Sequence, residues 1–181
     1  MSIVTDIKHW FGNWKLKRSD LEQKRKRQVF NLSGANRITL LFDATDPKDI
    51  IKIKELVKLL SPGKELVSAM GFVNEKDKSF EHMSTLHFDF FSNEDLNWYG
   101  KPQGMIIDNF LKEEYDILID LTLREFYPLT YMAVASPAKF KVGRCREDIN
   151  VFDLTIDNKK DQSLEVLIKE ITHYLNRIEP I

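Results

Sequence analysis

The stretch from Tyr115 to Arg144, YDILIDLTLREFYPLTYMAVASPAKFKVGR, constrains the fold more than any other part of the chain. It opens with an apolar run that ends at Asp120, which predicts a buried strand. A helix in YPLTYMAVAS follows, and its proline falls early, where the missing N–H does no harm. A second strand is predicted in AKFKVGR. Continuous apolar strands are typical of parallel sheets covered by helices on both faces, so this stretch predicts a β-α-β unit.

The same alternation of short apolar runs and amphipathic segments extends over the rest of the chain. RITLLFDAT predicts a strand from Arg37 to Phe42, and DPKDIIKIKELVKLL predicts a helix capped by Asp46. Further strands are predicted around residues 66–72, in TLHFDFF and in NVFDLTID. Further helices are predicted over residues 105–114 and in DQSLEVLIKEITHYLNRI, where Asp161 or Ser163 is the cap. This order predicts an α/β domain with a mostly parallel sheet, as a three-layer Rossmann-like or flavodoxin-like sandwich.

The N-terminal segment differs from the rest in charge. Residues 1–30 hold eight Lys and Arg against three Asp and Glu, whereas the other 151 residues hold 19 basic and 25 acidic side chains. Apolar residues recur there at steps of three and four, which predicts a helix with one aromatic face. We therefore divide the chain into a basic, aromatic helical arm (residues 1–33) and a single α/β domain (residues 34–181).

The arm allows three interpretations. Its aromatic and basic side chains resemble an interfacial amphipathic helix that meets a membrane surface; they are Trp10, Phe11, Trp14, Lys15, Lys17 and Arg18. The KRKR run could instead contact nucleic acid phosphates. In the third interpretation, which we favour, the aromatic face packs on the α/β domain, on a second copy of the chain or on another protein. Peripheral membrane contact comes next, and nucleic acid is not expected as a partner.

Polar residues at the strand ends are the candidates for a ligand site. In open parallel sheets, ligands bind outside the carboxyl ends of the strands. The candidates are Asp43, Thr45, Asp120, Thr122, Arg124 and Arg144, and Gly71, Asn74 and Gly143 also fall at predicted strand ends. The alternative interpretation is structural, because acids and threonines at such positions commonly cap helices or close turns.

Sequence motifs give no support to a cofactor. Neither Gly-x-Gly-x-x-Gly nor Gly-x-x-x-x-Gly-Lys-Ser/Thr occurs, and FDATDPKD stands where a dinucleotide fingerprint would follow the first strand. The segment EHMSTLHFD offers Glu81, His82, His87 and Asp89, but their spacing does not predict a metal site. We therefore expect no cofactor and no metal.

The sequence also bears on localisation. Cys145 is the single cysteine, so no intramolecular disulfide can form. No apolar run reaches the roughly 20 residues that span a bilayer. The first residues lack the pattern of a signal peptide, so the cytoplasm is the expected location.

Two resemblances add to this interpretation. Through FDAT, DLNWYGKPQG, YDILIDLT and SPAKFKVGR, the chain resembles a small uncharacterised family from Bacteroidota, which implies no activity. Separately, Tyr115–Arg144 resembles the N-terminal Rossmann-like half of heptosyltransferase-like glycosyltransferases, in a strand, a helix and a strand ending in glycine. This resemblance implies a Rossmann-like fold and a glycosyltransferase activity. Those enzymes use a second Rossmann-like domain to hold the nucleotide sugar, and we find none here, so no donor-binding residue is transferred.

The function remains unknown from the sequence, and two hypotheses follow. The first is a binding or interaction module with a crevice for a small polar ligand at the strand ends. The alternative is a divergent glycosyltransferase-like or other transferase-type enzyme that uses Asp43 and Asp120. If the chain is an enzyme, we expect a deep pocket at these acids, with convergent polar groups and a carboxylate of raised pKa. If it is a binding module, we expect a shallow or filled surface there.

Overall fold

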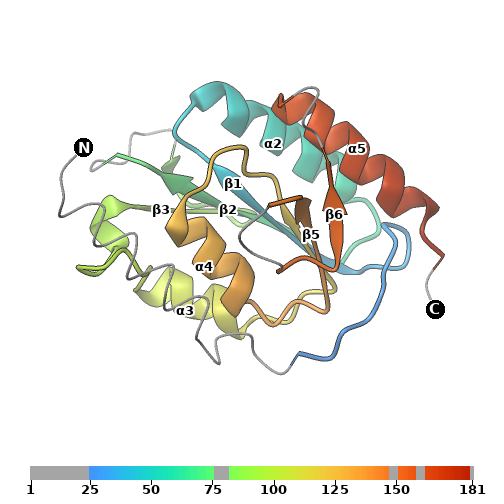
Figure 1. Cartoon of the computed structure of the whole chain (residues 1–181), viewed down its shortest axis with the longest axis horizontal. Helices are drawn as coiled ribbons and strands as arrows, with labels where there is room; N and C mark the ends of the chain where they lie inside the picture. The colour runs from blue at the N-terminus through green and yellow to red at the C-terminus, as the bar shows by residue number, and fades with distance from the viewer. Residues whose placement is uncertain (1–24, 76–81, 147–150, 158–161, 180–181) are drawn as a thin grey trace.

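A parallel six-stranded sheet lies between two layers of helices in the computed structural model of the chain (Figure 1). The structure describes residues 25–75, 82–146, 151–157 and 162–179. The strands are β1 (Arg37–Asp43), β2 (Leu66–Val73), β3 (Phe88–Ser92), β4 (Ile117–Asp120), β5 (Phe140–Arg144) and β6 (Leu154–Ile156). Their order is β3-β2-β1-β4-β5-β6, and every pairing is parallel. This order confirms the predicted α/β class, and it is the Rossmann order rather than the flavodoxin-like one.

From residue 47 onward, the helices follow the predicted pattern of elements, whereas residues 25–30, the end of the helix predicted for the arm, contain no helix. The helices are α2 (Pro47–Leu60), the short 3-10 helix η2 (Asn93–Asp95), α3 (Met105–Lys112), α4 (Tyr127–Ala135) and α5 (Leu164–Arg177). The Asp46 side chain accepts a hydrogen bond from the Lys48 N–H at 2.9 Å, as expected of a helix cap. Of the two predicted caps of α5, Ser163 is the one used, since its hydroxyl accepts from the Val166 N–H.

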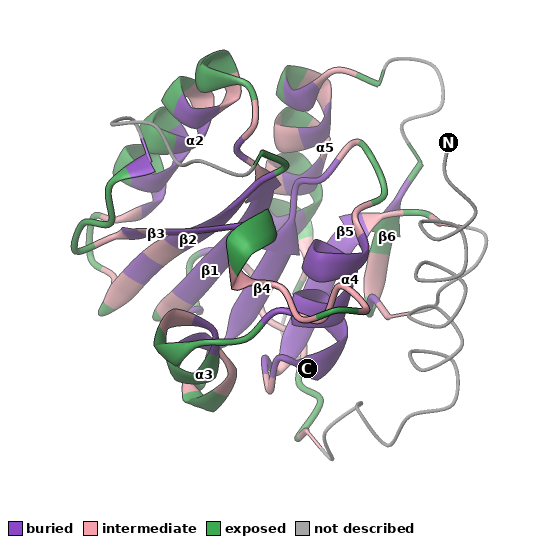
Figure 2. Cartoon of the chain, turned by 90° about the vertical axis from the view of Figure 1, so that its left-hand side faces the viewer, coloured by how far each residue is buried: buried purple, intermediate pink, exposed green. Residues whose placement is uncertain are grey.

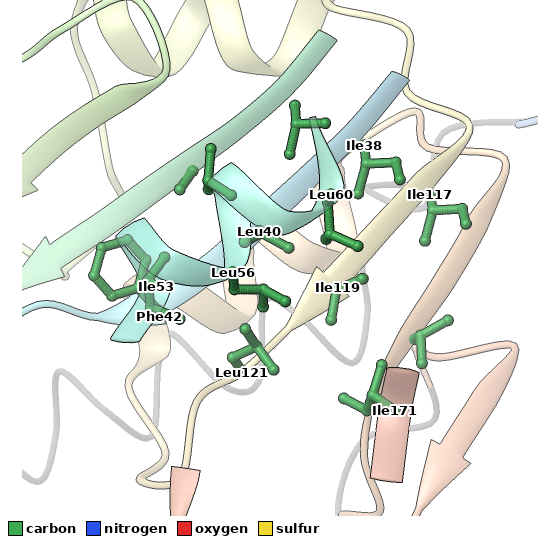
Figure 3. Packing of buried hydrophobic residues seen from close by; sticks show 14 of the residues in the cluster. Ile38, Leu40, Phe42, Ile53, Leu56, Leu60, Ile117, Ile119, Leu121 and Ile171 are labelled. Atoms are coloured by element: carbon green, nitrogen blue, oxygen red, sulfur yellow. The ribbon is translucent and has the colours of Figure 1, made fainter. Parts of the chain in front are cut away.

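The face of the sheet under α2 and α5 is apolar (Figures 1 and 3). Alternate residues of the central strands point toward these two helices, and those labelled in Figure 3 are Ile38, Leu40, Phe42, Ile117, Ile119 and Leu121. They pack with Ile53, Leu56 and Leu60 of α2 and Ile171 of α5. Burial of each such side chain contributes about 1.5–3 kcal/mol to stability.

The opposite face, under α3 and α4, has polar side chains among the apolar ones. Thr39, Asp120 and Lys141 are buried in the described structure, although they lie within the sheet. The Lys141 ammonium donates to the Val134 carbonyl of α4 at 2.9 Å. Helix α4 itself is buried along its whole length (Figure 2). Buried polar groups need hydrogen-bonded partners, so specific polar contacts are expected on this face of the sheet.

The segment that precedes β1 packs against the α/β domain. Leu32 and Ala35 are buried within the α2/α5 layer, and Arg25 forms an ion pair with Asp153 at 2.8 Å. The predicted arm up to residue 24 lies outside the described residues, so the boundary at residue 33 remains a prediction.

Candidate functional site

The strand order places the topological switch point between β1 and β4, where ligands usually bind. Asp120 is the last residue of β4 and lies beside Leu41 of β1, two residues before Asp43. The two predicted acids therefore stand on neighbouring strands at the carboxyl edge of the sheet.

Asp120 is fully buried, and its carboxylate is neutralised by an arginine. Its Oδ2 accepts from the Arg146 guanidinium at 2.8 Å, and its Oδ1 accepts from the Thr122 hydroxyl at 2.6 Å and the Thr122 N–H at 2.9 Å. The Arg146 side chain is only 2% exposed and also donates to the Thr130 hydroxyl of α4 at 2.9 Å. These four residues, Asp120, Thr122, Thr130 and Arg146, form what we call the Asp120 cluster, and they leave its carboxylate no open face.

Asp43 is likewise engaged, at the surface. Its Oδ2 pairs with Arg124 at 2.5 Å, and its Oδ1 accepts from the Thr45 N–H at 3.0 Å. The Thr45 hydroxyl in turn accepts from the Asn74 N–H at 3.0 Å, so the loops after β1 and β2 are joined. The structure thus brings the predicted residues together in pairs that bind each other, and the switch point is filled by protein side chains.

The remaining predicted strand-end residues serve packing or stand apart. In the described part of the chain, no hydrogen bond or ion pair joins Arg144 to the other five candidates. Gly143 lies against the Phe152 ring, where an added Cβ would come within 2.6 Å of a ring carbon. Gly71 is enclosed in the same way by Ala44 and Phe90. These two glycines allow close packing rather than close approach of a ligand.

An aromatic pocket of about 340 Å³ opens beside the switch point, at the ends of β2 and β3 and the start of α4. We call it the aromatic pocket. It is lined by Phe72, Asn74, Asn93, Leu96, Asn97, Trp98, Tyr99, Gly100, Phe126, Tyr127 and Pro128. None of these side chains is charged, and of the residues that the sequence placed at strand ends only Asn74 is among them.

The wall of the aromatic pocket is a tight loop after η2. The Asn97 Oδ1 accepts from the N–H groups of Tyr99 and Lys101 at 3.2 and 2.9 Å, and Leu96 bridges to Pro102. Gly100 has a φ of +89°, a conformation that favours glycine, which turns the chain back toward α4. This loop holds Trp98 with 67% of its surface exposed, against the ring of Tyr99 at 5.1 Å.

Three polar groups of the aromatic pocket are open to a ligand. The Asn93 amide donates to the Asn74 Oδ1 at 3.4 Å, and the described structure shows no further side-chain hydrogen bond for either residue. The side-chain NH₂ group of Asn74 and the side-chain carbonyl oxygen of Asn93 are thereby left as a donor and an acceptor. Burial raises the pKa of Tyr127 to about 12, helped by the nearby phenols of Tyr99 and Tyr131. The Tyr127 hydroxyl therefore stays protonated at neutral pH and can donate.

Trp98, Tyr99 and Tyr127 are the site residues that the sequence interpretation missed. Trp98 and Tyr99 lie in a loop, where hydrophobic periodicity carries no signal, and Tyr127 is buried at the start of α4, where the pattern indicates packing and not a ligand site. From the sequence, the segment DLNWYGKPQG contributes only to the family resemblance. One asparagine and a Trp-Tyr pair ahead of two glycines are the available sign of a structured, exposed loop.

The histidines of the considered metal site bind the backbone instead. His82 Nε2 lies 3.0 Å from the Ala44 carbonyl oxygen, and His87 Nδ1 lies 2.9 Å from that of Val67. Glu81 falls outside the described residues. Within residues 25–75, 82–146, 151–157 and 162–179, no three metal-ligating side chains gather.

The arm residues Trp10, Phe11, Trp14, Lys15, Lys17 and Arg18 lie outside the described residues. Contact of the arm with a membrane, a protein partner or a second copy of the chain therefore stays a prediction. In the described part of the chain, no helix has both the length and the apolar character needed to cross a bilayer.

Comparison with known proteins gives a family and no activity. A family model described as "Family of unknown function (DUF6913)" matches residues 8–178. No curated protein and no solved structure matches the chain. The match extends over the arm as well as the α/β domain.

Proposed function

This chain belongs to the family of unknown function DUF6913, and we propose that it is a binding module whose aromatic pocket takes an uncharged, flat heterocycle of nucleobase size. One observation carries the proposal. Aromatic side chains and a free donor–acceptor pair, on Asn74 and Asn93, converge in one pocket at the ligand-binding edge of a Rossmann-ordered sheet.

The pocket lining offers contacts for both the flat face and the polar edge of such a ligand. A flat ring can stack on Trp98 or Tyr99, and base–aromatic stacking contributes about 1–3 kcal/mol. The edge of a heterocycle carries alternating donors and acceptors, which complement the side-chain NH₂ group of Asn74 and the side-chain carbonyl oxygen of Asn93. Because no charged side chain lines the pocket, a neutral ring is favoured over an ionised one.

The filled switch point favours a module over a transferase. A transferase needs a carboxylate or another base that can reach the substrate. Asp120 is enclosed by Arg146 and Thr122, and Asp43 is held by Arg124. Neither acid lines the aromatic pocket. We place the module in the cytoplasm, because Cys145 is the only cysteine and the chain needs no oxidising compartment.

The proposal is tested by calorimetry and thermal unfolding of the full chain with adenosine, guanosine, cytidine and uridine, and with glucose as a control ligand. At least one nucleoside is expected to bind and raise the melting temperature, since a ligand specific for the folded state stabilises it. Trp98→Ala is expected to weaken that binding about tenfold, the equivalent of one lost stacking contact.

Tyr174→Ala is the matched control, because Tyr174 is also an exposed aromatic residue but lies on α5, across the sheet from α3 and α4. Its affinity for the nucleoside should equal that of the unmodified chain. Flat melting curves with all four nucleosides, or equal losses in both variants, would contradict the proposal.

A further inference from the structure

We propose that a second pocket, on the α3/α4 face of the sheet, binds a small organic cation that consists of a primary ammonium group on a short alkyl chain. We call it the polar pocket, and its volume is about 230 Å³. Its polar lining includes Thr39, Ser68, Asp89, Glu113 and Tyr115. It shares no lining residue with the aromatic pocket, so this proposal stands independently of the proposed function.

Three hydroxyl groups gather in the polar pocket. Thr39 of β1 and Ser68 of β2 are partners in register, and their hydroxyls lie 3.2 Å apart in a hydrogen bond. The Tyr115 hydroxyl is hydrogen-bonded to both. Burial raises the pKa of Tyr115 to about 12, so this hydroxyl is neutral at physiological pH. Hydroxyl oxygens are acceptors as well as donors, and can receive N–H bonds from an ammonium group.

Asp89 supplies the charge. It lies on β3 beside Met70, is half-buried, and makes no hydrogen bond or ion pair with another described residue. Four other aspartates at or beside strand ends are paired with cations: Asp43 with Arg124, Asp116 with Lys139, Asp120 with Arg146 and Asp153 with Arg25. A carboxylate withdrawn from water is costly unless a cation compensates it, so Asp89 is complementary to a charge that a ligand would bring.

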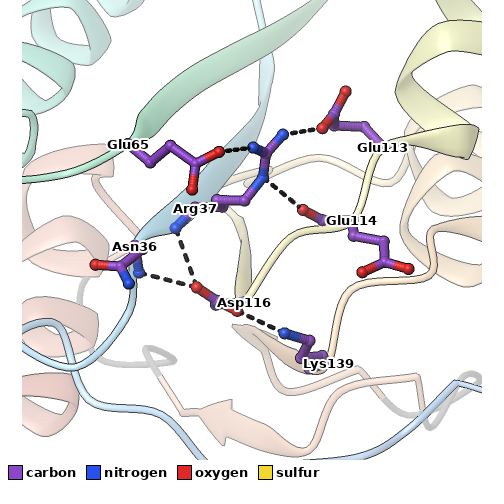
Figure 4. A network of polar contacts seen from close by, with 7 residues as sticks. All are labelled: Asn36, Arg37, Glu65, Glu113, Glu114, Asp116 and Lys139. Atoms are coloured by element: carbon purple, nitrogen blue, oxygen red, sulfur yellow. Dashed lines mark hydrogen bonds and ion pairs between the residues drawn. The ribbon is translucent and has the colours of Figure 1, made fainter.

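The surrounding charges also favour a cation. Glu113 lines the pocket and binds Arg37, whose guanidinium is shared with Glu65 (Figure 4). The single positive charge of Arg37 is thus shared by the carboxylates of Glu113 and Glu65. Lys139 is held by Asp116 on the other side of the same network (Figure 4). Neither Arg37 nor Lys139 forms an ion pair with Asp89, so these two cations leave the Asp89 carboxylate available to a cationic ligand.

The remaining walls define the body of the ligand. Leu66, Met70, Ile106 and Phe110 are apolar and suit a few methylene groups. A hard metal ion fits poorly, because Ca²⁺ and Mg²⁺ need about six oxygen ligands and Asp89 is the one carboxylate of the described lining without a partner. An alkylammonium ion needs one carboxylate, a few hydroxyls and an apolar wall, which are the groups present.

The test is isothermal calorimetry of the full chain with butylammonium chloride, 1-butanol and MgCl₂ as separate probes. Butylammonium is expected to bind in a 1:1 complex at least tenfold more tightly than 1-butanol. Asp89→Asn keeps the shape of the side chain and removes its charge, and is expected to weaken butylammonium binding at least tenfold.

Asp108→Asn is the control, since Asp108 is an exposed aspartate on α3 that lies outside the pocket lining. It should bind butylammonium like the unmodified chain. A thermal melt of Asp89→Asn verifies folding, and its stability should be retained because an uncompensated charge is removed. Equal binding of butanol and butylammonium, undiminished binding by Asp89→Asn, or displacement of butylammonium by Mg²⁺ would each overturn the proposal.

Discussion

Two ion pairs at the carboxyl edge of the sheet share the same chemistry and differ in burial. Asp120 and Arg146 are 0% and 2% exposed in their side chains, whereas Arg124 is 65% exposed in its pair with Asp43. In the exposed pair, water can replace either partner, so its net contribution is small. In the buried pair, each charge depends on the other because water cannot reach it.

Removal of Arg146 should therefore destabilise the protein far more than removal of Arg124. Arg146→Ala leaves Asp120 buried without a counter-charge, and we expect a loss of about 3–5 kcal/mol in the free energy of unfolding. Arg124→Ala should cost less than about 1 kcal/mol. Urea unfolding followed by circular dichroism measures both. Similar small losses in the two variants would show that Asp120 finds another partner.

At this scale, the sequence located the acids but not what they bind. Asp43 and Asp120 could be found because an acid after an apolar strand must lie at the edge of the sheet. Their partners could not be predicted, because Arg124 lies 81 residues from Asp43 and Arg146 lies 26 residues from Asp120. Which arginine reaches which acid depends on strand order, and hydrophobic periodicity does not report strand order.

At the scale of elements, helices and strands were predictable from the sequence, and the loop that forms the wall of the aromatic pocket was not. The apolar runs of β1, β2 and β4 and the amphipathic pattern of α2 and α5 correspond to the residues that are buried. The loop of the aromatic pocket has no such period, because its shape comes from side-chain hydrogen bonds of Asn97 and from the φ of Gly100. Such local hydrogen bonding can be suspected from Asn and Gly but not built from them.

Two glycine substitutions separate the shape of this loop from general backbone strain. Gly100 and Gly63 both have positive φ, +89° and +75°. An alanine at either position should cost about 1–2 kcal/mol of stability. Only at Gly100 would the new Cβ approach Tyr127, at 3.3 Å, whereas nothing lies within 4 Å of one at Gly63.

Gly100→Ala should therefore weaken nucleoside binding in the aromatic pocket, whereas Gly63→Ala should lower the melting temperature and leave the affinity unchanged. Calorimetry and thermal melts of the two variants measure these effects. A loss of affinity in Gly63→Ala equal to that in Gly100→Ala would show that the pocket responds to overall stability and not to the loop.

At the scale of the whole molecule, a polar network at the amino ends of the strands joins the two halves of the sheet (Figure 4). The Asp116 carboxylate accepts from the N–H groups of Asn36 and Arg37 at 2.9 and 3.1 Å and from Lys139 at 2.9 Å. It thereby holds together the starts of β1, β4 and β5. Burial alone would raise the pKa of Asp116, but these hydrogen bonds outweigh burial and lower it.

This lowered pKa makes the stability of the molecule depend on acid pH. A carboxyl group whose pKa is lower in the folded state stabilises the protein above its unfolded pKa of about 3.9, and this contribution is lost as the pH falls through the folded pKa. The unmodified chain should be more stable than Asp116→Asn at pH 7, and the difference should shrink below about pH 4. Urea unfolding from pH 7 to pH 3 measures it. A difference that stays constant down to pH 3 would contradict the assignment to Asp116.

The pairing of β1 with β4 has a consequence for how the chain is made. Asn36 and Asp116, which meet beside this pairing, are 80 residues apart in the sequence, whereas β1, β2 and β3 follow one another along the chain. During synthesis on the ribosome, β1, β2 and β3 can assemble while β4 has not yet been translated. One edge of β1 then stays open to other chains. The partly synthesised protein would be more prone to aggregate than the finished one, until translation passes Asp120.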